Sequence, residues 1–248
     1  MFATSLSNLA GRNRNTMPAD SILKDRGTMP MASDSCTGCG TCAGNCPTAA
    51  ITIDGDGWSV DLGKCIFCMD CAMVCPSKAI SETDSPDYAL DRGDLVVHRG
   101  TDIKGMEKQL DKETRRMFSG SLAIRELDTG SCNACEIELN CMSNQFYDAY
   151  RFGIKFVASP RHADALMVTG PMAENMREAV ARTDEATPSP KLVIANGTCA
   201  ISGGVFVGGD VAPSGICDVL EPDVYVIGCP PSPNRVVRAL VKALGMRH

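Results

Sequence analysis

The sequence carries the stretch CTGCGTCAGNCP at residues 36–47, and the same pattern returns as CIFCMDCAMVCP at residues 65–76. Both copies follow the spacing C-x2-C-x2-C-x3-C-P. Three thiols of each copy lie in one tight loop and the fourth lies about one helical turn further on, so each copy can wrap a compact inorganic core. The prolines that end the copies, Pro47 and Pro76, fix the chain just after the fourth cysteine and remove a backbone donor there.

A doubled run of this spacing is the bacterial-type signature of two [4Fe–4S] clusters, in which the fourth cysteine of each run binds the cluster of the other run. The spacing therefore predicts two ligand sets, namely Cys36, Cys39, Cys42 and Cys75 for one cluster and Cys65, Cys68, Cys71 and Cys46 for the other. A structural zinc site needs only four thiolates and usually takes two separated CxxC pairs. A disulfide framework requires an oxidising compartment, which nothing in the sequence indicates.

Composition restricts the class of protein. The chain has 248 residues, enough for one large or two small domains, and its 14 cysteines exceed what a cytosolic protein keeps as free thiols. A net charge of −6 without a basic stripe argues against a nucleic acid partner. No apolar run reaches the roughly 18 residues of a membrane span, and the N-terminus lacks the apolar core of a signal peptide. We therefore expect a cytoplasmic chain that reaches a membrane only through partner subunits.

The first part of the chain divides by composition. Residues 1–31 show no sustained periodicity and predict a flexible N-terminal tail. Residues 32–82 contain the cysteine runs and short strand-like pieces, which predict a small α+β bacterial ferredoxin-like domain of βαββαβ order. Such a module has little core of its own, so the clusters are expected to hold it together. Residues 83–120 are polar and punctuated by Pro and Gly, and predict a linker with a charged helix over residues 104–117.

Residues 121–248 alternate between strand-like and helix-like patterns, which is typical of a parallel α/β sheet. Strands are expected over residues 121–127, 153–159, 163–170, 191–196 and 223–228, and helices over residues 174–182 and 234–244. The last helix is amphipathic, with valines and leucines on one side and basic residues on the other. The pattern predicts a flavodoxin-like sheet of four or five parallel strands with helices on both faces.

Four further cysteines follow predicted strands, namely Cys132 and Cys135 after the first, Cys199 in NGTCAISGG and Cys229 in GCPPSP. Loops at the carboxyl ends of parallel strands meet at one edge of the sheet, which is where such folds build their sites. Four thiolates from three loops can hold one more [4Fe–4S] cluster, and neighbouring glycines let backbone N–H groups approach its sulfurs. The pattern alone also permits zinc or unligated buried thiols.

Longer segments carry a resemblance to a known family. GSCNACEIE (130–138), SPRHADALMVTG (159–170), GTCAISGGVF (197–206) and GCPPSP (228–233) resemble, in this order, the small subunit of group 4 [NiFe] hydrogenases, including the formate hydrogenlyase type. They are also similar to the homologous cluster-bearing subunit of respiratory complex I. Trp58 and the segment LGKCIFCMDCAMVCP (62–76) resemble the separate ferredoxin-like subunit of the same complexes. The chain thus resembles a fusion of two neighbouring electron-relay subunits.

The resemblance implies a third [4Fe–4S] cluster, bound by Cys132, Cys135, Cys199 and Cys229 and placed against a large subunit that carries a Ni–Fe centre. The chain would then be the electron-relay subunit of a membrane-associated hydrogenase, without a catalytic residue of its own. Its partners would be the large subunit, membrane subunits and an electron donor or acceptor subunit. The C-x2-C start favours the hydrogenase branch, because the complex I homologue starts with two adjacent cysteines.

Three alternatives stay open beside this interpretation. The first is a complex I-like module that delivers electrons to a quinone, and the second is a related complex whose large subunit lacks nickel. The third is a free-standing ferredoxin-like carrier, which would be stable without any large subunit. Nickel content separates the first two from a hydrogenase, and a monomeric state would favour the third.

Five other residues are candidates for lesser roles. Glu136 follows Cys135 and matches an acidic position of the family, where it could tune the cluster, belong to a proton path or stabilise a helix N-terminus. His162 also matches a family motif and is expected to be structural, whereas Arg161 is a candidate for contact with the large subunit. Cys141 and Cys217 lie outside any ligand spacing, and we expect ordinary thiols.

Overall fold

The cysteine-rich half of the chain builds two small sheets. The structure, a computed structural model, describes residues 16–24, 27–55 and 57–246. The first elements in chain order are α2 (Ala19–Lys24), β1 (Thr28–Ala32), α3 (Thr41–Gly44), β2 (Ile51–Asp54), β3 (Gly57–Asp61), α4 (Asp70–Met73) and β4 (Ile80–Asp84). From β1 to β4 this is the predicted βαββαβ order. β1 pairs antiparallel with β4, and β2 pairs antiparallel with β3.

The remaining elements build the larger half of the protein. The strands are β5 (Tyr88–Ala89), β6 (Val96–His98), β7 (Leu122–Asp128), β8 (Ile154–Phe156), β9 (Ala165–Thr169), β10 (Leu192–Asn196) and β11 (Val224–Val226). The α-helices are α5 (Lys112–Phe118), α6 (Ala134–Cys141), α7 (Arg177–Ala186), α8 (Thr198–Ser202) and α9 (Pro233–Leu244). The short 3-10 helices are η1 (Gly93–Leu95), η2 (Ile103–Gly105), η3 (Ala149–Phe152), η4 (Pro160–His162), η5 (Glu174–Met176), η6 (Gly204–Phe206) and η7 (Ile216–Asp218).

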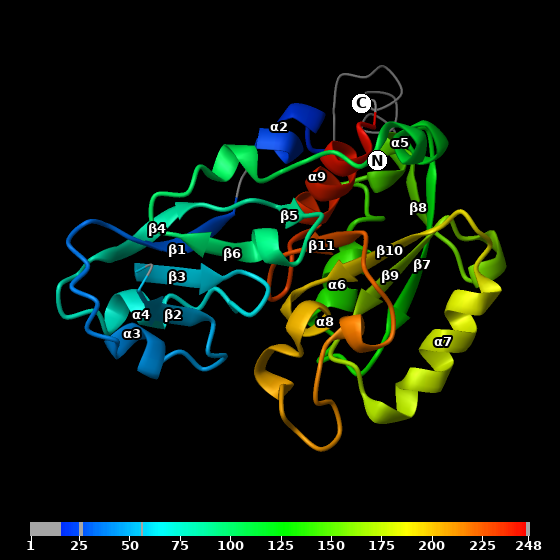
Figure 1. The fold of residues 1–248 in the computed structure, drawn as a ribbon. Helices are drawn as coiled ribbons and strands as arrows, with labels where there is room; N and C mark the ends of the chain where they lie inside the picture. The colour runs from blue at the N-terminus through cyan, green and yellow to red at the C-terminus, as the bar shows by residue number, and fades with distance from the viewer. Residues whose placement is uncertain (1–15, 25–26, 56, 247–248) are drawn as a thin grey trace, which may run out of the picture.

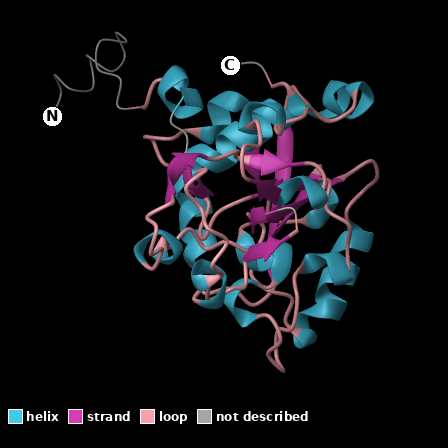
Figure 2. Ribbon diagram, turned by 60° about the vertical axis from the view of Figure 1, so that its left-hand side comes forward, coloured by secondary structure: helices cyan, strands magenta, loops and turns pink. Residues whose placement is uncertain are grey.

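Six strands of the described chain form one mostly parallel sheet in the order β5-β11-β10-β9-β7-β8. Five of them run parallel, which confirms the predicted number, and β5 adds an antiparallel edge strand beside β11. β9, β10 and β11 are buried along their whole length, and β7 is buried over its first three residues, as expected for a sheet that is covered on both faces. Helices lie on both sides of the strands (Figure 2).

Each face of this sheet has its own hydrophobic core. On one face, Ile124, Met167 and Ile194 pack with α9 and with residues of α2 and α6. On the other face, Leu127 and Val168 belong to a core that also contains Val180 of α7 and Ile201 of α8. That second core continues into the cysteine-rich half, where it includes Trp58, Val60 and Leu62. One apolar core therefore joins the two halves of the protein (Figure 1).

Residues 83–120, predicted as a linker, contribute strands to both halves. β5 pairs with β11 in the large sheet, and β6 pairs with β3 to complete a three-stranded sheet with β2. The expected helix over residues 104–117 is shorter than predicted, since α5 begins at Lys112. Asp111 ends the preceding extended segment and caps α5, because its side chain accepts hydrogen bonds from the backbone N–H groups of Glu113 and Thr114.

The expectation of a flexible tail over residues 1–31 is wrong for its last part, and residues 1–15 lie outside the described chain. Ile22 of α2 is fully buried against α9. Met29 and Ala32 of β1, which pairs with β4, are buried in the core of the cysteine-rich half. The segment of β1 is short and contains Pro30, which normally argues against a strand. β1 tolerates this proline because it lies at the edge of a two-stranded sheet. Its alternation of apolar and polar residues is too short and too irregular to predict a strand from the sequence.

Candidate iron–sulfur sites

The two cysteine runs fold into matching loops. The second and fourth residues after the first cysteine of each run have positive φ, which are Gly38 and Gly40 in the first run and Phe67 and Met69 in the second. Positive φ turns the backbone so that the three cysteines of one loop share a concave side, and it favours glycine. A short helix, α3 or α4, then begins just before the third cysteine. The two loops therefore share one backbone path, although only the first has glycines at these positions.

The second predicted ligand set comes together in the structure. A small cavity is lined by Cys46, Cys65, Cys68 and Cys71 together with Pro30, Ile51 and Ile66. Burial raises the pKa of Cys65 to about 12, with the nearby charges of Cys46, Cys71 and Cys68 acting in the same direction. Burial also raises the pKa of Cys71 to about 11, and Cys68 and Cys46 again contribute. The fourth cysteine of the first run thus lies with the first three of the second run.

Within the first predicted ligand set, electrostatic interactions link only some of the four thiols. Burial raises the pKa of Cys42, and the charge of Cys36 adds to this shift. Cys39 is exposed, and its sulfur lies 3.4 Å from the hydroxyl of Thr41. Cys75 packs half-buried against the same core as Cys36. Cys42 in turn raises the pKa of Cys71, which indicates that the two sets are neighbours.

The two crossing cysteines have equivalent surroundings. Cys46 accepts a hydrogen bond from the backbone N–H of Ala50 at 3.3 Å, and Cys75 accepts one from Ala79 at 3.3 Å. A hydroxyl also lies two residues after each of them, on Thr48 and Ser77. Hydrogen bonds to sulfur favour the thiolate, which is the form that binds metal. The sulfurs of both crossing cysteines therefore accept a backbone hydrogen bond, as the sulfurs of cluster ligands commonly do.

The third set of cysteines lies at the carboxyl edge of the large sheet. Cys132 and Cys135 follow β7, Cys199 lies in α8 directly after β10, and Cys229 follows β11. A methyl group on Gly197 would lie 2.9 Å from the sulfur of Cys135, and one on Gly204 would lie 2.8 Å from the sulfur of Cys199. Only glycine leaves room for these sulfurs, so the backbone encloses the site closely.

Charges of these four thiols act on one another. Burial raises the pKa of Cys199 to about 12, and the charges of Cys229 and Cys132 contribute to the rise. Burial and the charges of Glu136, Cys199 and Cys229 raise the pKa of Cys135 still further. Thiols of this kind stay protonated at neutral pH unless a cation neutralises them. Iron bound there would supply that cation and would deprotonate its ligands, so the donor set fits a metal cluster.

The cysteine sites have several features that cluster-binding sites share. Within the described ranges, no group of three or more His, Cys, Asp or Glu side chains is arranged to hold one metal ion. Four of the thiols, those of the second set, line one small cavity. The fit to iron–sulfur clusters rests on the four thiols of the second set around one cavity, on glycines that would collide with sulfur if substituted, and on N–H groups that donate to sulfur.

Glu136 lies in a distinct environment beside the third set. Both of its carboxylate oxygens are buried without a hydrogen-bond partner among the described residues. The side chain borders a cavity that also contains Arg125, Glu126 and Tyr150. Burial, together with the charge of Glu136, raises the pKa of Glu126. The carboxylate is thus close to the cysteines and faces the cavity.

The other predicted residues lie further out. Arg161 and His162 are exposed in η4, before β9. Cys141 is half-buried at the end of α6, and the sulfur of Cys217 lies 3.9 Å from the hydroxyl of Tyr225. The structure does not bring these four residues into the cysteine sites.

Trp58 is a residue whose role sequence reasoning missed. Its side chain is buried in β3, and its indole N–H has no partner that meets hydrogen-bond geometry among the described residues. The same N–H lies near enough to Cys42 to lower the pKa of that thiol against the effect of burial. The sequence signal for it was its position as the single tryptophan in the hairpin between the two cysteine runs.

Comparisons with known proteins agree with the two halves. Residues 132–243 match the family described as "NADH ubiquinone oxidoreductase, 20 Kd subunit". Residues 35–79 match the family described as "4Fe-4S dicluster domain". The first match contains all four cysteines of the third set, and the second contains both cysteine runs.

Individual relatives extend these matches. The chain is 41% identical over 141 residues to "Probable membrane-bound hydrogenase subunit mbhJ" of Pyrococcus furiosus, which covers 57% of this chain and 84% of that protein. It is 39% identical over 144 residues to "Formate hydrogenlyase subunit 7" of Escherichia coli, covering 58% of this chain and 55% of that protein. It is 42% identical over 108 residues to a subunit of the NADH-quinone oxidoreductase of Geobacter metallireducens, covering 44% of this chain and 63% of that protein. The chain therefore belongs to the family of the NADH ubiquinone oxidoreductase 20 kDa subunit.

Proposed function

We propose that this chain is the electron-relay subunit of a membrane-associated [NiFe] hydrogenase complex of group 4, the formate hydrogenlyase type. Relatives in a membrane-bound hydrogenase and in formate hydrogenlyase support the proposal. In it, residues 32–82 form a ferredoxin-like domain and residues 121–248 a hydrogenase small-subunit-like domain, fused through residues 83–120. The parallel strand order β8-β7-β9-β10-β11 supports a flavodoxin-like second domain, because it is the doubly wound order of that fold.

The observation that carries the proposal is the arrangement of Cys132, Cys135, Cys199 and Cys229 at the carboxyl edge of the sheet. This edge lies beside the loop of the second cysteine run, which supports a path between the second and third sets. Cysteines of the two runs share one core, which supports a path between the first and second sets. Clusters bound there would accept and release single electrons, at potentials set by charge, hydrogen bonding and exposure. An electron relay needs several redox sites in sequence, whereas a free carrier that exchanges electrons at one site does not.

The chain's own residues supply the binding and the tuning. The cysteines hold the iron as thiolates, and the N–H groups of Ala50 and Ala79 stabilise negative charge on the sulfurs of Cys46 and Cys75. The backbone at Gly197 and Gly204 packs closely against the sulfurs of Cys135 and Cys199. Residues of this chain do not transform the substrate in this proposal, and the H₂ chemistry belongs to a large subunit with a Ni–Fe centre.

An apolar loop next to the third set supports the docking of that large subunit. Val205, Phe206, Val207 and Val211 are exposed, and they follow the helix that contains Cys199. Exposed apolar patches of this kind mark protein contacts. No helix in the described part of the chain has the length and apolar character of a membrane span. In this proposal, attachment to the membrane goes through partner subunits, and an electron donor or acceptor subunit docks near the cysteine runs.

Nickel content and hydrogen-dependent dye reduction of the native complex, purified without oxygen, test the proposal. We expect nickel in the complex and reduction of a dye by H₂. A Cys229→Ser variant should keep nickel in the large subunit and lose dye reduction, because the third set is broken. A complex without nickel that does not oxidise H₂ would contradict the hydrogenase assignment.

The second candidate is a complex I-like module that passes electrons to a quinone. The relative from the NADH-quinone oxidoreductase of Geobacter metallireducens favours it, since its identity of 42% is as high as that of the hydrogenase relatives. The same purified complex distinguishes the two functions. Quinone reduction in a nickel-free complex would favour this candidate, and H₂ oxidation would exclude it.

A further inference from the structure

The second cysteine run touches the third cysteine site directly. The hydroxyl of Thr198 lies 2.9 Å from the carbonyl oxygen of Cys65 and 3.1 Å from the carbonyl oxygen of Gly228. Its backbone N–H also donates to Gly228, at 2.9 Å. Thr198 precedes Cys199, and Gly228 precedes Cys229. The buried hydroxyl of Thr198 therefore contacts Cys65, a predicted ligand of the second set, and Gly228. Thr198 and Gly228 are themselves the residues that precede two predicted ligands of the third set.

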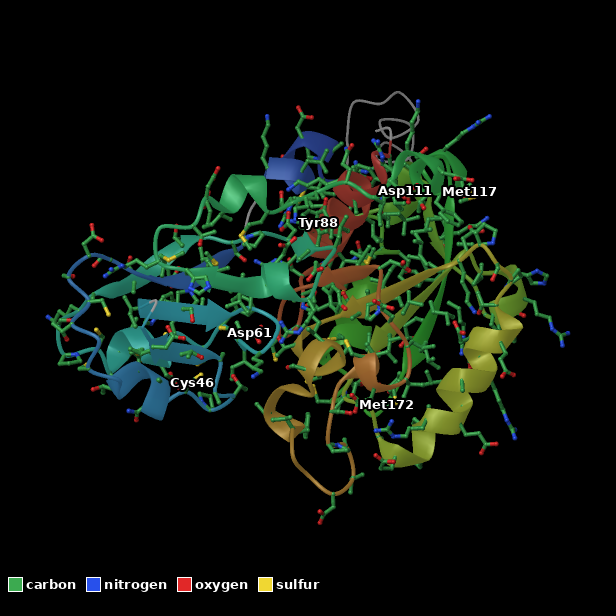
Figure 3. The ribbon with its side chains drawn as sticks, in the orientation of Figure 1. Cys46, Asp61, Tyr88, Asp111, Met117 and Met172 are labelled. Atoms are coloured by element: carbon green, nitrogen blue, oxygen red, sulfur yellow. The ribbon has the colours of Figure 1, made fainter. Side chains whose placement is uncertain are left out.

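Two further contacts hold the same loop, residues 63–67, against the third site. A methyl group on Gly63 would lie 2.8 Å from Cγ2 of Ile201, so the loop backbone rests directly on α8. The guanidinium of Arg235 lies 5.4 Å from the ring centroid of Phe67 and donates to the carbonyl oxygen of Ile227 at 3.2 Å. Figure 1 shows the loop after β3 extending toward α8 and β11. In Figure 3, Asp61 at the start of this connection lies closer to that junction than Cys46 does.

The contact between Thr198 and Cys65 is buried, which makes its loss costly in free energy. The side chain of Thr198 is 1% exposed, and the carbonyl oxygen of Cys65 lies in the same enclosed junction. A buried carbonyl that loses its donor is costly, because no water replaces the bond. The hydroxyl thus fixes the separation of the two loops.

We propose that Thr198 is the positioning residue that couples the second ligand set to the third, through the bonded path from Cys65 across the Thr198 hydroxyl to Cys199. This inference rests on the proposed electron relay. It also assigns the order of the sites along the relay: the set of Cys46, Cys65, Cys68 and Cys71 exchanges electrons directly with the third set. The set that contains Cys36, Cys39 and Cys42 is then the outer one. One electron passes in each event, so the donor site is oxidised and the acceptor site reduced by one electron, and no bond forms or breaks at Thr198.

A pair of Thr198 variants tests the contact. Thr198→Val keeps the shape of the side chain and removes the hydroxyl, while Thr198→Ser keeps the hydroxyl and serves as the control. In the intact complex, hydrogen–deuterium exchange of residues 63–67 and of α8 should speed up by about fivefold in Thr198→Val and little in Thr198→Ser. Electron transfer between the second and third sites after flash reduction should slow in Thr198→Val alone. Equal exchange and equal transfer in the two variants would overturn the proposal.

A matched pair of ligand variants tests the order. Cys39 and Cys68 are both exposed and hold the same position in their runs. Replacing Cys68 by Ser should remove the magnetic interaction of the reduced third cluster with its neighbour in the electron paramagnetic resonance spectrum, and replacing Cys39 should leave it. Loss of the interaction in the Cys39→Ser protein, or its persistence in the Cys68→Ser protein, would overturn the order.

The two proposals fail in different ways. Wild-type complex without iron–sulfur signals refutes the proposed function, whereas the exchange measurement still reports whether Thr198 holds the loops together. Wild-type complex with three cluster signals, in which Thr198→Val behaves like wild type, refutes only the role of Thr198.

Discussion

The guanidinium of Arg238 holds the carboxylate of Asp87 with two hydrogen bonds, from Nε to Oδ2 at 2.9 Å and from Nη2 to Oδ1 at 2.8 Å. Both side chains are buried, and Lys242 donates to the same carboxylate at 3.0 Å. Burial by itself raises the pKa of Asp87, but the hydrogen bonds and charges of Arg238 and Lys242 lower it overall. Since Asp87 precedes β5 and Arg238 lies in α9, the pair fixes residues 83–120 onto the large half.

Replacing Asp87 by Asn should destabilise the protein by roughly 3–5 kcal/mol, because Arg238 stays buried without its counter-charge. Urea unfolding of the oxygen-free protein measures the change. Asp20→Asn is the control, because the pair that Asp20 forms with Lys24 is exposed and its loss should have little effect. Equal stability of the two variants would contradict a stabilising role for the buried pair.

The same carboxylate predicts a pH dependence. The folded-state pKa of Asp87 is lower than the ordinary value of 3.8, so its contribution to stability is fully present above that value. It is lost as the pH falls through the lower folded-state pKa. Acid unfolding curves of wild-type protein and Asp87→Asn should therefore converge below about pH 4. Curves that stay parallel to low pH would contradict this assignment.

Gly197→Ala should disrupt the third cysteine site. Its φ is +93°, and the added methyl group would lie 2.9 Å from the sulfur of Cys135. Gly208→Ala is the matched control, since Gly208 has a φ of +79° and nothing within 4 Å of the added carbon. Both variants carry backbone strain, but only the methyl group of Gly197→Ala would clash with a cysteine sulfur. Iron analysis should show a loss of about four iron atoms in Gly197→Ala and none in Gly208→Ala.

Trp58→Phe should lower the reduction potential of the cluster bound by Cys42. The indole N–H near Cys42 stabilises negative charge on sulfur, and the reduced state carries more of it. Losing one such interaction corresponds to on the order of 40 mV for a one-electron couple. A redox titration followed by electron paramagnetic resonance measures this shift. An unchanged potential, with the cluster still bound, would show that the N–H does not act on the cluster.

Local patterns predicted much of the fold. The strands from β7 to β11 were predictable because each is a short apolar run between turn residues, and α9 because its apolar side repeats with helical period. β1, β5 and β6 were not predictable, because two to five residues without a clear period form strands only when a partner strand is present. Their pairing depends on tertiary contacts that distant sequence positions supply.

The cysteine sites were also predictable only where their residues are close in sequence. Cysteine spacing identified the two runs, because the ligands of such loops are close in sequence. The close approach of Gly197 to Cys135, and the bond from Thr198 to Cys65, join residues more than 60 positions apart, so no local pattern contains them. Phe67 and Met69 show the same limit, since neither residue type signals the positive φ that Gly38 and Gly40 signal in the first run.

Iron and sulfide analysis of the complex, purified without oxygen, tests the central claim of three clusters most directly. We expect about twelve iron atoms and about twelve sulfides in this chain, and about eight of each after Cys229→Ser. Zinc in place of iron, about four iron atoms in the wild-type chain, or an iron content that Cys229→Ser leaves unchanged would contradict it.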